Sequence, residues 1–280
     1  MRVVDLMRHT SGLTYGFQQR TNVDAAYRKL HIGEIPTALS LEQMIDELAK
    51  VPLEFSPGSA WNYGVSTDVV GYLVGKISGQ PFEQFLRSRI LDPLGMSDTD
   101  FMVPAAKASR FAACYAATPK GGMALQDDPQ TSFFLKPPTF VSGGGGLVST
   151  AADYLRFCKM LLNGGALDGV RLVSPKTLEL MSHNHLPGSK DLPDLAVSLF
   201  SEVTYAGVGF GLGFAVCVSP ARGLLPGSPG DISWGGLAST YFWVDPREQL
   251  IVIFMTQLLP SSSYPIRRQL KALVYQALID

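Results

Sequence analysis

The segment at residues 233–237 reads Ser-Trp-Gly-Gly-Leu, and it lies between a turn-rich run at 226–231 and an apolar segment at 239–244. Glycines that lead into a strand let the atoms of a ligand approach the backbone closely. Backbone N–H groups at such a sheet edge can bind an oxyanion, the charged oxygen that forms when a carbonyl is attacked. The alternative is a structural bulge at the entry to a strand, and this segment taken alone favours that alternative.

A nucleophile for such a site is not evident among the other residues. None of the ten lysines has Ser, Thr or Cys three positions before it, so the chain contains no Ser-x-x-Lys motif. No serine lies in Gly-x-Ser-x-Gly, which excludes the nucleophile elbow of α/β-hydrolases. His183 and His185 are two residues apart, but no further ligands are arranged around them, which gives little support for a metal site.

Helical periodicity is clear in several segments. Ser40 opens a helix at 41–50 through a capping box with Gln43, and the apolar residues that follow keep the 3.6-residue period. Further helices are expected from 66 or 67 to 78, from about 82 to 91, at 151–162, at 175–181 and at 265–279. Residues 2–7 fit either a strand or the start of a helix.

Strand patterns concentrate in the second half of the chain. We expect a strand at 210–218 and a hairpin formed by 239–245 and 250–257, whereas 101–141 should be long loops with one or two short strands. The order of elements indicates an α+β fold, an antiparallel sheet flanked by helices with a mainly helical lobe. We place the helical lobe at 1–145 and the α/β lobe, with the terminal helix, at 146–280. The four glycines at 143–146 suit a close-packed crossing between the lobes.

Composition narrows the function classes. A net charge of −1 provides no electrostatic footprint for nucleic acid or an anionic membrane. Apolar runs are too short to span a bilayer, and the N-terminus lacks the apolar core of a signal peptide. The three cysteines lie far apart and are odd in number, which favours a reducing compartment, and we therefore expect a cytoplasmic location.

Five short motifs follow one another along the chain. They are M-R-H-T-S-G-L at 7–13, P-G with W-N-Y at 57–63, I-L-D-P-L-G-M at 90–96, G-G-G-L-V-S-T at 144–150 and W-G-G at 234–236. In this order they resemble the serine β-lactamase and penicillin-binding-protein superfamily. W-G-G narrows the resemblance to the class C-like family VIII carboxylesterases, in which it replaces the K-T-G motif of penicillin-recognising relatives. The resemblance implies a β-lactamase/DD-peptidase-like fold and no metal or organic cofactor.

The resemblance also implies residue roles. In the superfamily a serine in Ser-x-x-Lys attacks the carbonyl, and a tyrosine from a second loop completes the proton-transfer network. Tyr63 occupies the tyrosine position, although a packed aromatic at a helix entry is the alternative. Trp234, Gly235 and Gly236 occupy the third motif. Leu237 or Ala238 would then supply a strand N–H for the oxyanion.

The missing Ser-x-x-Lys motif is the main departure from the family. In relatives it lies upstream of H-T-S-G-L, so the sequence looks truncated, without the nucleophile helix and the first strands of the sheet. Three interpretations remain open: an omitted upstream segment, a non-catalytic binding or scaffold relative, or a nucleophile supplied by another chain. Lost strands would leave an unpaired sheet edge, through which the protein could self-associate.

The expected substrate is a small neutral ester with a short acyl group. A β-lactamase or DD-peptidase is the alternative enzyme. A lysine in the third motif would suit a substrate carboxylate, and Trp234 cannot supply that charge.

Overall fold

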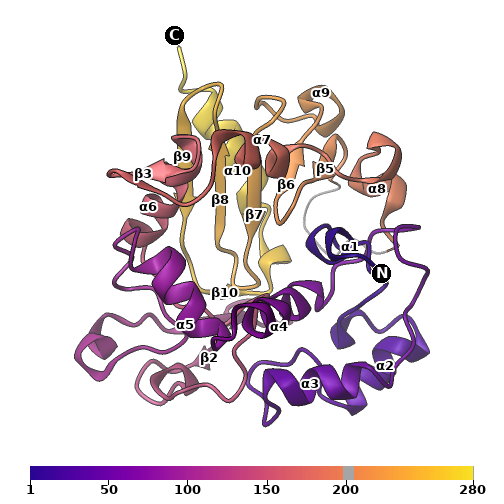
Figure 1. Cartoon of the computed structure of the whole chain (residues 1–280). Coiled ribbons are helices and arrows are strands. Elements are labelled where there is room, and N and C mark those ends of the chain that lie inside the picture. Colours follow the sequence, from indigo (N-terminus) through magenta and orange to yellow (C-terminus); the bar gives the residue numbers. More distant parts are fainter. Residues whose placement is uncertain (198–204, 280) are drawn as a thin grey trace.

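The main sheet has five antiparallel strands in the order β5-β6-β7-β8-β9 (Figure 1). The computed structural model describes residues 1–197 and 205–279. The strands are β5 (Val208–Phe210), β6 (Ala215–Cys217), β7 (Ile232–Gly235), β8 (Tyr241–Asp245) and β9 (Leu250–Phe254). Together with the surrounding helices, this sheet confirms the α+β fold.

Helices cover both faces of this sheet. Adjacent residues of a strand point to opposite faces, and β8 shows which helix lies on each. Phe242 contacts Tyr154 of α6 (Ala151–Leu162), with ring centroids 5.1 Å apart. Trp243 stacks on Tyr275 of α10 (Ile266–Tyr275), with centroids 6.2 Å apart. The core between α6 and the sheet includes Cys158, Ile232 and Val244.

The N-terminal helices form a second core. In Figure 1 they are coloured indigo to violet and lie below and beside the orange and yellow sheet. They are α1 (Val3–Met7), α2 (Asn22–Lys29), α3 (Leu41–Leu48), α4 (Ser66–Ser78) and α5 (Phe82–Leu86), the last continued by a π-helical turn at Arg87–Leu91. Their shared core includes Leu6, Tyr27, Met44 and Val65.

Smaller elements complete the molecule. A three-stranded sheet joins β10 (Leu258–Leu259), β1 (Cys114–Ala117) and β2 (Met123–Asp127), so the chain on either side of the predicted lobe boundary shares one sheet. The others are β3 (Ala166–Leu167), β4 (Val170–Arg171), α7 (Pro175–Ser182), α8 (Leu192–Leu195) and α9 (Pro220–Gly223). Across residues 1–197 and 205–279, no helix is both long and apolar enough to cross a membrane.

Two predictions about strands need correction. The single strand expected at 210–218 is a hairpin, because β5 and β6 are joined by a turn in which Gly213 has a φ of +98°. The W-G-G motif does not lead into the strand that follows it. Trp234 and Gly235 instead end β7, and Gly236 begins the turn to β8. The predicted helices are confirmed, and so is the hairpin of β8 and β9, with their ends moved by a few residues.

The glycine run at 143–146 packs against α4. A Cβ atom built on Gly143 would lie 2.1 Å from the backbone oxygen of Thr67, closer than any side chain could be accommodated. At Gly144 it would lie 2.8 Å from the Thr67 hydroxyl oxygen. The close packing is therefore observed for these two glycines, which let the chain pass directly over the start of α4, but α4 lies in the same predicted lobe, so a crossing between the lobes stays a prediction.

Candidate active site

Tyr63 lies on the loop that enters α4, and backbone hydrogen bonds fix this loop on two sides. The Trp61 N–H donates to the Leu195 carbonyl at 2.9 Å, and the Asn62 N–H donates to the His9 carbonyl at 2.9 Å. Trp61 and Asn62 are both buried, whereas Tyr63 is half-buried. The loop is thus held between α1 and the α8 segment, which are far apart in sequence.

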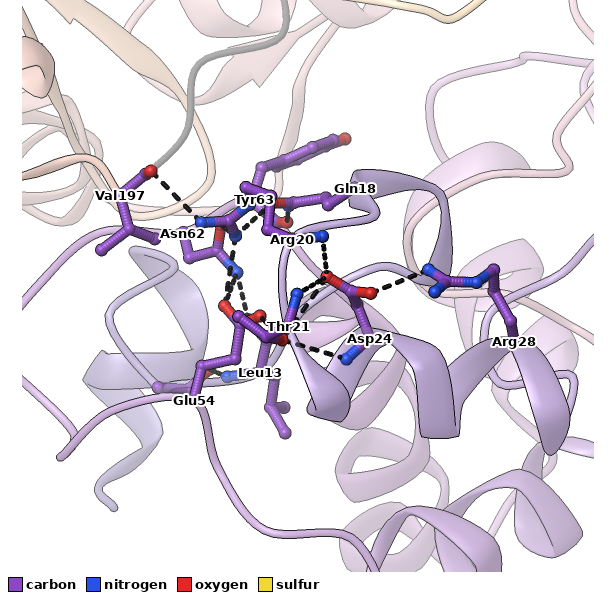
Figure 2. Close-up of polar contacts among 11 residues, drawn as sticks. Leu13, Gln18, Arg20, Thr21, Asp24, Arg28, Glu54, Asn62, Tyr63 and Val197 are labelled. Carbon is purple, nitrogen blue, oxygen red and sulfur yellow. Dashed lines mark hydrogen bonds and ion pairs between the residues drawn. The ribbon is translucent and has the colours of Figure 1, made fainter.

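A polar network supports the same loop from the α2 side (Figure 2). The Gln18 Nε2 donates to the Tyr63 carbonyl at 2.6 Å. Asn62 donates to the Leu13 carbonyl at 3.1 Å and accepts from Arg20 at 3.1 Å. Arg20 also pairs with Glu54 at 3.2 Å. These contacts converge on Asn62 and on the Tyr63 carbonyl, so they fix the backbone of the loop at Tyr63.

Trp234 and Tyr63 meet although they are 171 positions apart in the sequence. The Trp234 Nε1–H donates to the Tyr63 hydroxyl oxygen at 3.4 Å, and the ring centroids are 5.3 Å apart. Because adjacent strand residues alternate, Gly235 faces the other side of β7. A Cβ on Gly235 would lie 2.6 Å from the Arg267 guanidinium of α10. The structure therefore brings together two of the residues predicted from the sequence.

Three further residues surround Tyr63 that the sequence analysis did not assign to the site. The His9 ring lies 4.8 Å from the Tyr63 ring, and burial lowers the pKa of His9 to about 3, so this imidazole is neutral at neutral pH. The Tyr15 ring lies 5.4 Å from the Tyr63 ring. Asp68 is fully buried on the first turn of α4, and burial raises the pKa of its carboxyl group. The sequence offered two hints that these residues belong to the site: His9 lies inside the first motif, and Asp68 follows Tyr63 by five residues.

The predicted oxyanion donors lie in a turn rather than in a strand. Arg267 donates to the Gly236 carbonyl at 2.8 Å, and the Gly236 N–H donates to the Thr240 carbonyl at 2.9 Å, which together define the turn. Leu237 and Ala238 follow at its tip, and Leu237 is 70% exposed. In the described part of the chain, neither of their N–H groups donates a hydrogen bond. The expectation of a strand N–H is wrong, but either turn N–H is available to a ligand.

The serine of the first motif is structural. The Ser11 and Ser66 hydroxyl oxygens are 2.8 Å apart, both residues are fully buried, and Ser11 accepts from the Leu13 N–H at 3.2 Å. A hydroxyl enclosed in this way ties the turn after α1 to the start of α4. It is not presented to a substrate.

Comparison with curated proteins finds relatives that align with at least 90% of this chain. Protein Rv1367c of Mycobacterium tuberculosis (strain ATCC 25618 / H37Rv) is 36% identical over 264 residues, covering 93% of this chain and 63% of that protein. Esterase EstB of Burkholderia gladioli is 30% identical over 270 residues, covering 90% of this chain and 63% of that protein. The chain thus spans less than two thirds of the length of these relatives.

Solved structures share the fold. EstCE1, described as a hydrolase with promiscuous acyltransferase activity, superposes with a TM-score of 0.79 at 26% identity, covering 97% of this chain and 71% of that one. Simvastatin synthase LovD of Aspergillus terreus superposes with a TM-score of 0.77 at 23% identity, covering 100% of this chain and 69% of that one, which shows the fold alone. The Beta-lactamase family model matches residues 1–276. The chain belongs to the beta-lactamase family, within the superfamily of serine β-lactamases and penicillin-binding proteins.

Proposed function

We propose that this chain forms the proton-transfer and oxyanion-binding part of a carboxylesterase that cleaves short-chain esters through an acyl-enzyme. The Ser-x-x-Lys nucleophile would come from polypeptide outside residues 1–280. The contact between Tyr63 and Trp234 carries the proposal, because it places the second and third motifs at one point. The esterase and hydrolase relatives agree with it.

The proposed reaction has two steps. The serine hydroxyl attacks the ester carbonyl, its proton passes to the Lys and Tyr63 network, and the N–H of Leu237 or Ala238 stabilises the oxyanion. Collapse of this intermediate releases the alcohol, which takes up the proton. Water then attacks the acyl-enzyme in the same way, and the acid is released. Each step moves one proton, which in this proposal Tyr63 accepts and returns.

The walls of the site favour neutral esters over substrates that carry a carboxylate. Trp234 presents an indole where a cation would bind a carboxylate. Arg267, the cation beside this motif, lies against Gly235 on the other face of β7 and donates to the Gly236 carbonyl. Its guanidinium is held by the Gly236 and Thr240 carbonyls of the turn after β7, on the face of the strand opposite Trp234.

The test compares the 280-residue chain with the same chain extended in frame by its upstream coding sequence. We expect a fluorophosphonate to form a stoichiometric adduct, seen by intact mass, only on the extended protein. That protein should hydrolyse p-nitrophenyl butyrate faster than a chromogenic cephalosporin. Tyr63→Phe should lower kcat/KM at least about 100-fold, while Tyr115→Phe, an exposed tyrosine on β1, should leave it unchanged.

Each alternative has its own outcome in this experiment. Faster turnover of the cephalosporin would reassign the protein as a β-lactamase. If the extended protein contains no Ser-x-x-Lys motif and forms no adduct, the protein would be assigned as a non-catalytic binding or scaffold protein. A stoichiometric adduct on the 280-residue chain alone would show that it carries another nucleophile, and the proposed division of the site would then be wrong.

We also propose a cytoplasmic location and self-association through a sheet edge. Cys114, Cys158 and Cys217 are free thiols, which agrees with a reducing compartment. Within the described residues β9 pairs only with β8, so its other edge is open to a strand from a second copy.

A further inference from the structure

Arg267 of α10 joins the two ends of the turn at 236–240. Its Nη2 donates to the Gly236 carbonyl at 2.8 Å and to the Thr240 carbonyl at 3.3 Å. The same two residues are also linked directly, since the Gly236 N–H donates to the Thr240 carbonyl at 2.9 Å. Arg267 is 9% exposed, and its guanidinium lies 5.5 Å from the centre of the Tyr241 ring. A single buried cation therefore holds both ends of this turn.

The two glycines of the W-G-G motif make room for this arrangement. A Cβ atom on Gly235 would lie 2.6 Å from the Arg267 guanidinium, and one on Gly236 would lie 2.3 Å from the Thr240 hydroxyl oxygen. Cβ atoms essentially never come this close to another atom. A side chain at position 235 would therefore displace the guanidinium, whereas one at position 236 would force the Thr240 side chain to move. Gly235 thus admits Arg267 to the strand, and Gly236 lets the turn close.

The hydrogen bond from Arg267 also sets the direction of a neighbouring N–H. The peptide bond between Gly236 and Leu237 is trans, so its C=O and N–H groups point in opposite directions. The Gly236 carbonyl points to Arg267 on the α10 face of β7, and the Leu237 N–H consequently points away from Arg267. The Ala238 N–H shares its peptide unit with the Leu237 carbonyl, which accepts no hydrogen bond in the described part of the chain. Only the first of these two N–H groups is therefore held from behind.

We infer that Arg267 is a positioning residue: by fixing the Gly236 carbonyl, it presents the Leu237 N–H on the opposite face of β7. Trp234 and Tyr63 meet on that face. A charged donor on a carbonyl also polarises the whole peptide unit, which makes the N–H of that unit a stronger donor. The role of Arg267 in catalysis rests on the proposed function, in which a turn N–H stabilises the oxyanion.

The first measurement is amide hydrogen exchange by NMR on the 280-residue chain, without substrate or nucleophile. The Gly236 and Ser239 N–H groups both donate within the turn, and in Arg267→Ala we expect them to exchange at least about ten times faster. Methylguanidinium should restore their protection because it supplies the lost donors, whereas methylammonium lacks the guanidinium fork and should not. Arg268→Ala, the next residue of α10, is the matched control and should change neither N–H.

The amides of β8 and β9 separate a local effect from general destabilisation, and they should exchange as in wild type. Gly235→Ala keeps the arginine but displaces its guanidinium, so it should speed exchange of the same two N–H groups without any response to methylguanidinium. Unchanged exchange at Gly236 and Ser239 in Arg267→Ala would overturn the inference. So would an equal rise across β8 and β9 that methylguanidinium does not reverse.

The second measurement uses the protein extended by its upstream coding sequence, with p-nitrophenyl butyrate as the substrate. An oxyanion donor acts mainly in the transition state. Arg267→Ala should therefore lower kcat by about 10- to 100-fold and leave KM within about twofold, with partial recovery in methylguanidinium. A loss that appears in KM alone would contradict the positioning role. An extended wild-type protein that hydrolyses no ester would instead contradict the proposed function, and the exchange measurement would still decide whether Arg267 fixes the turn.

Discussion

Asp24 is a fully buried carboxylate in the first turn of α2. It accepts hydrogen bonds from the Arg20 N–H at 2.6 Å and the Thr21 N–H at 2.8 Å, and it pairs with Arg28 at 2.8 Å (Figure 2). Burial acts to raise the pKa of Asp24, but these donors outweigh burial and lower it below the usual value. The ionised form is therefore the one that stabilises the turn carrying Arg20 towards the Tyr63 loop.

We predict that Asp24→Asn lowers the free energy of unfolding at pH 7 by about 2 kcal/mol. A carboxyl whose pKa is lowered by folding contributes stability above its unfolded pKa, near 3.9, and loses it as the pH falls through the folded pKa. The difference between wild type and Asp24→Asn in urea denaturation should thus be full at pH 7 and shrink below about pH 4. Exposed Asp46→Asn should stay within about 0.5 kcal/mol of wild type at both pH values. A gap for Asp24→Asn that does not change with pH would contradict this account.

At the scale of elements, the glycine run offers a matched pair of positions. A Cβ atom on Gly143 would lie 2.1 Å from the Thr67 carbonyl oxygen, whereas one on Gly145 would lie 3.6 Å from the end of Ile35, an ordinary contact. We predict that Gly143→Ala destabilises the fold by about 2 kcal/mol or more, because the run must move away from α4. Gly145→Ala should cost less than about 1 kcal/mol. Thermal unfolding of both variants tests this, and equal losses would show that the close approach to α4 is not the cause.

The edge strand β9 is apolar along its whole length, and each of its side chains is half-buried. Natural sheet edges usually carry charges or prolines that prevent pairing with other chains, and Leu250–Phe254 has neither. We predict that the 280-residue chain self-associates with rising concentration in light scattering, and that Val252→Lys shifts it towards monomer. Leu273→Lys is the control, because Leu273 is 58% exposed and belongs to α10 rather than to β9. Wild-type protein that stays monomeric over the concentration range would rule out the β9 edge as an interface.

The sequence predicts helices better than strand ends for identifiable reasons. The Ser40 capping box and the apolar period after Thr150 are local signals, and α3 and α6 begin at those caps. The alternation of apolar residues at 210–218 continues through a tight turn. Glycine occurs both in strands and in turns, so the sequence does not reveal that Gly213 has a positive φ. The W-G-G turn is set by Arg267 more than 30 residues later, so local residue types could not reveal it.

The residues of the candidate site likewise divide into those that the sequence could predict and those that it could not. Tyr63 and Trp234 could be predicted because each lies in a short motif with a known place in the family. Tyr15 has no such motif, and Asp68 reads as an ordinary acidic residue in the first turn of a helix. Their proximity to Tyr63 depends on how the glycine run, α4 and the segment after α1 pack together, and a single sequence provides no distances between such segments.

For the molecule as a whole, a buried ion pair joins the terminal helix to the sheet. The Lys271 Nζ of α10 lies 2.8 Å from Asp231, just before β7, and the two side chains are 11% and 1% exposed. Lys271 also lies 5.9 Å from the ring centroids of Trp243 and Tyr275. The pair therefore fixes α10, and with it Arg267, against the strand that carries Trp234.

We predict that Lys271→Met lowers the free energy of unfolding by about 3–5 kcal/mol, because it leaves the Asp231 charge buried without its partner. The double variant Lys271→Met with Asp231→Leu should recover most of that loss, since no buried charge remains. Denaturant titrations of the single and double variants give the coupling energy. Exposed Lys29→Met serves as the control. A double variant no more stable than Lys271→Met would mean that Asp231 has a further role in the fold.

The aromatic surroundings of Tyr63 have an optical consequence. The chain has three tryptophans, and two of them flank Tyr63: Trp61, stacked at 6.3 Å and 13°, and Trp234 at 5.3 Å. Ionisation of a phenol between two indoles should quench their emission, whereas Trp243, next to Lys271, lies on the opposite side of the sheet. Fluorescence of the unlabelled protein would then report the charge of Tyr63 directly, and a ligand entering the site would be visible by the same signal.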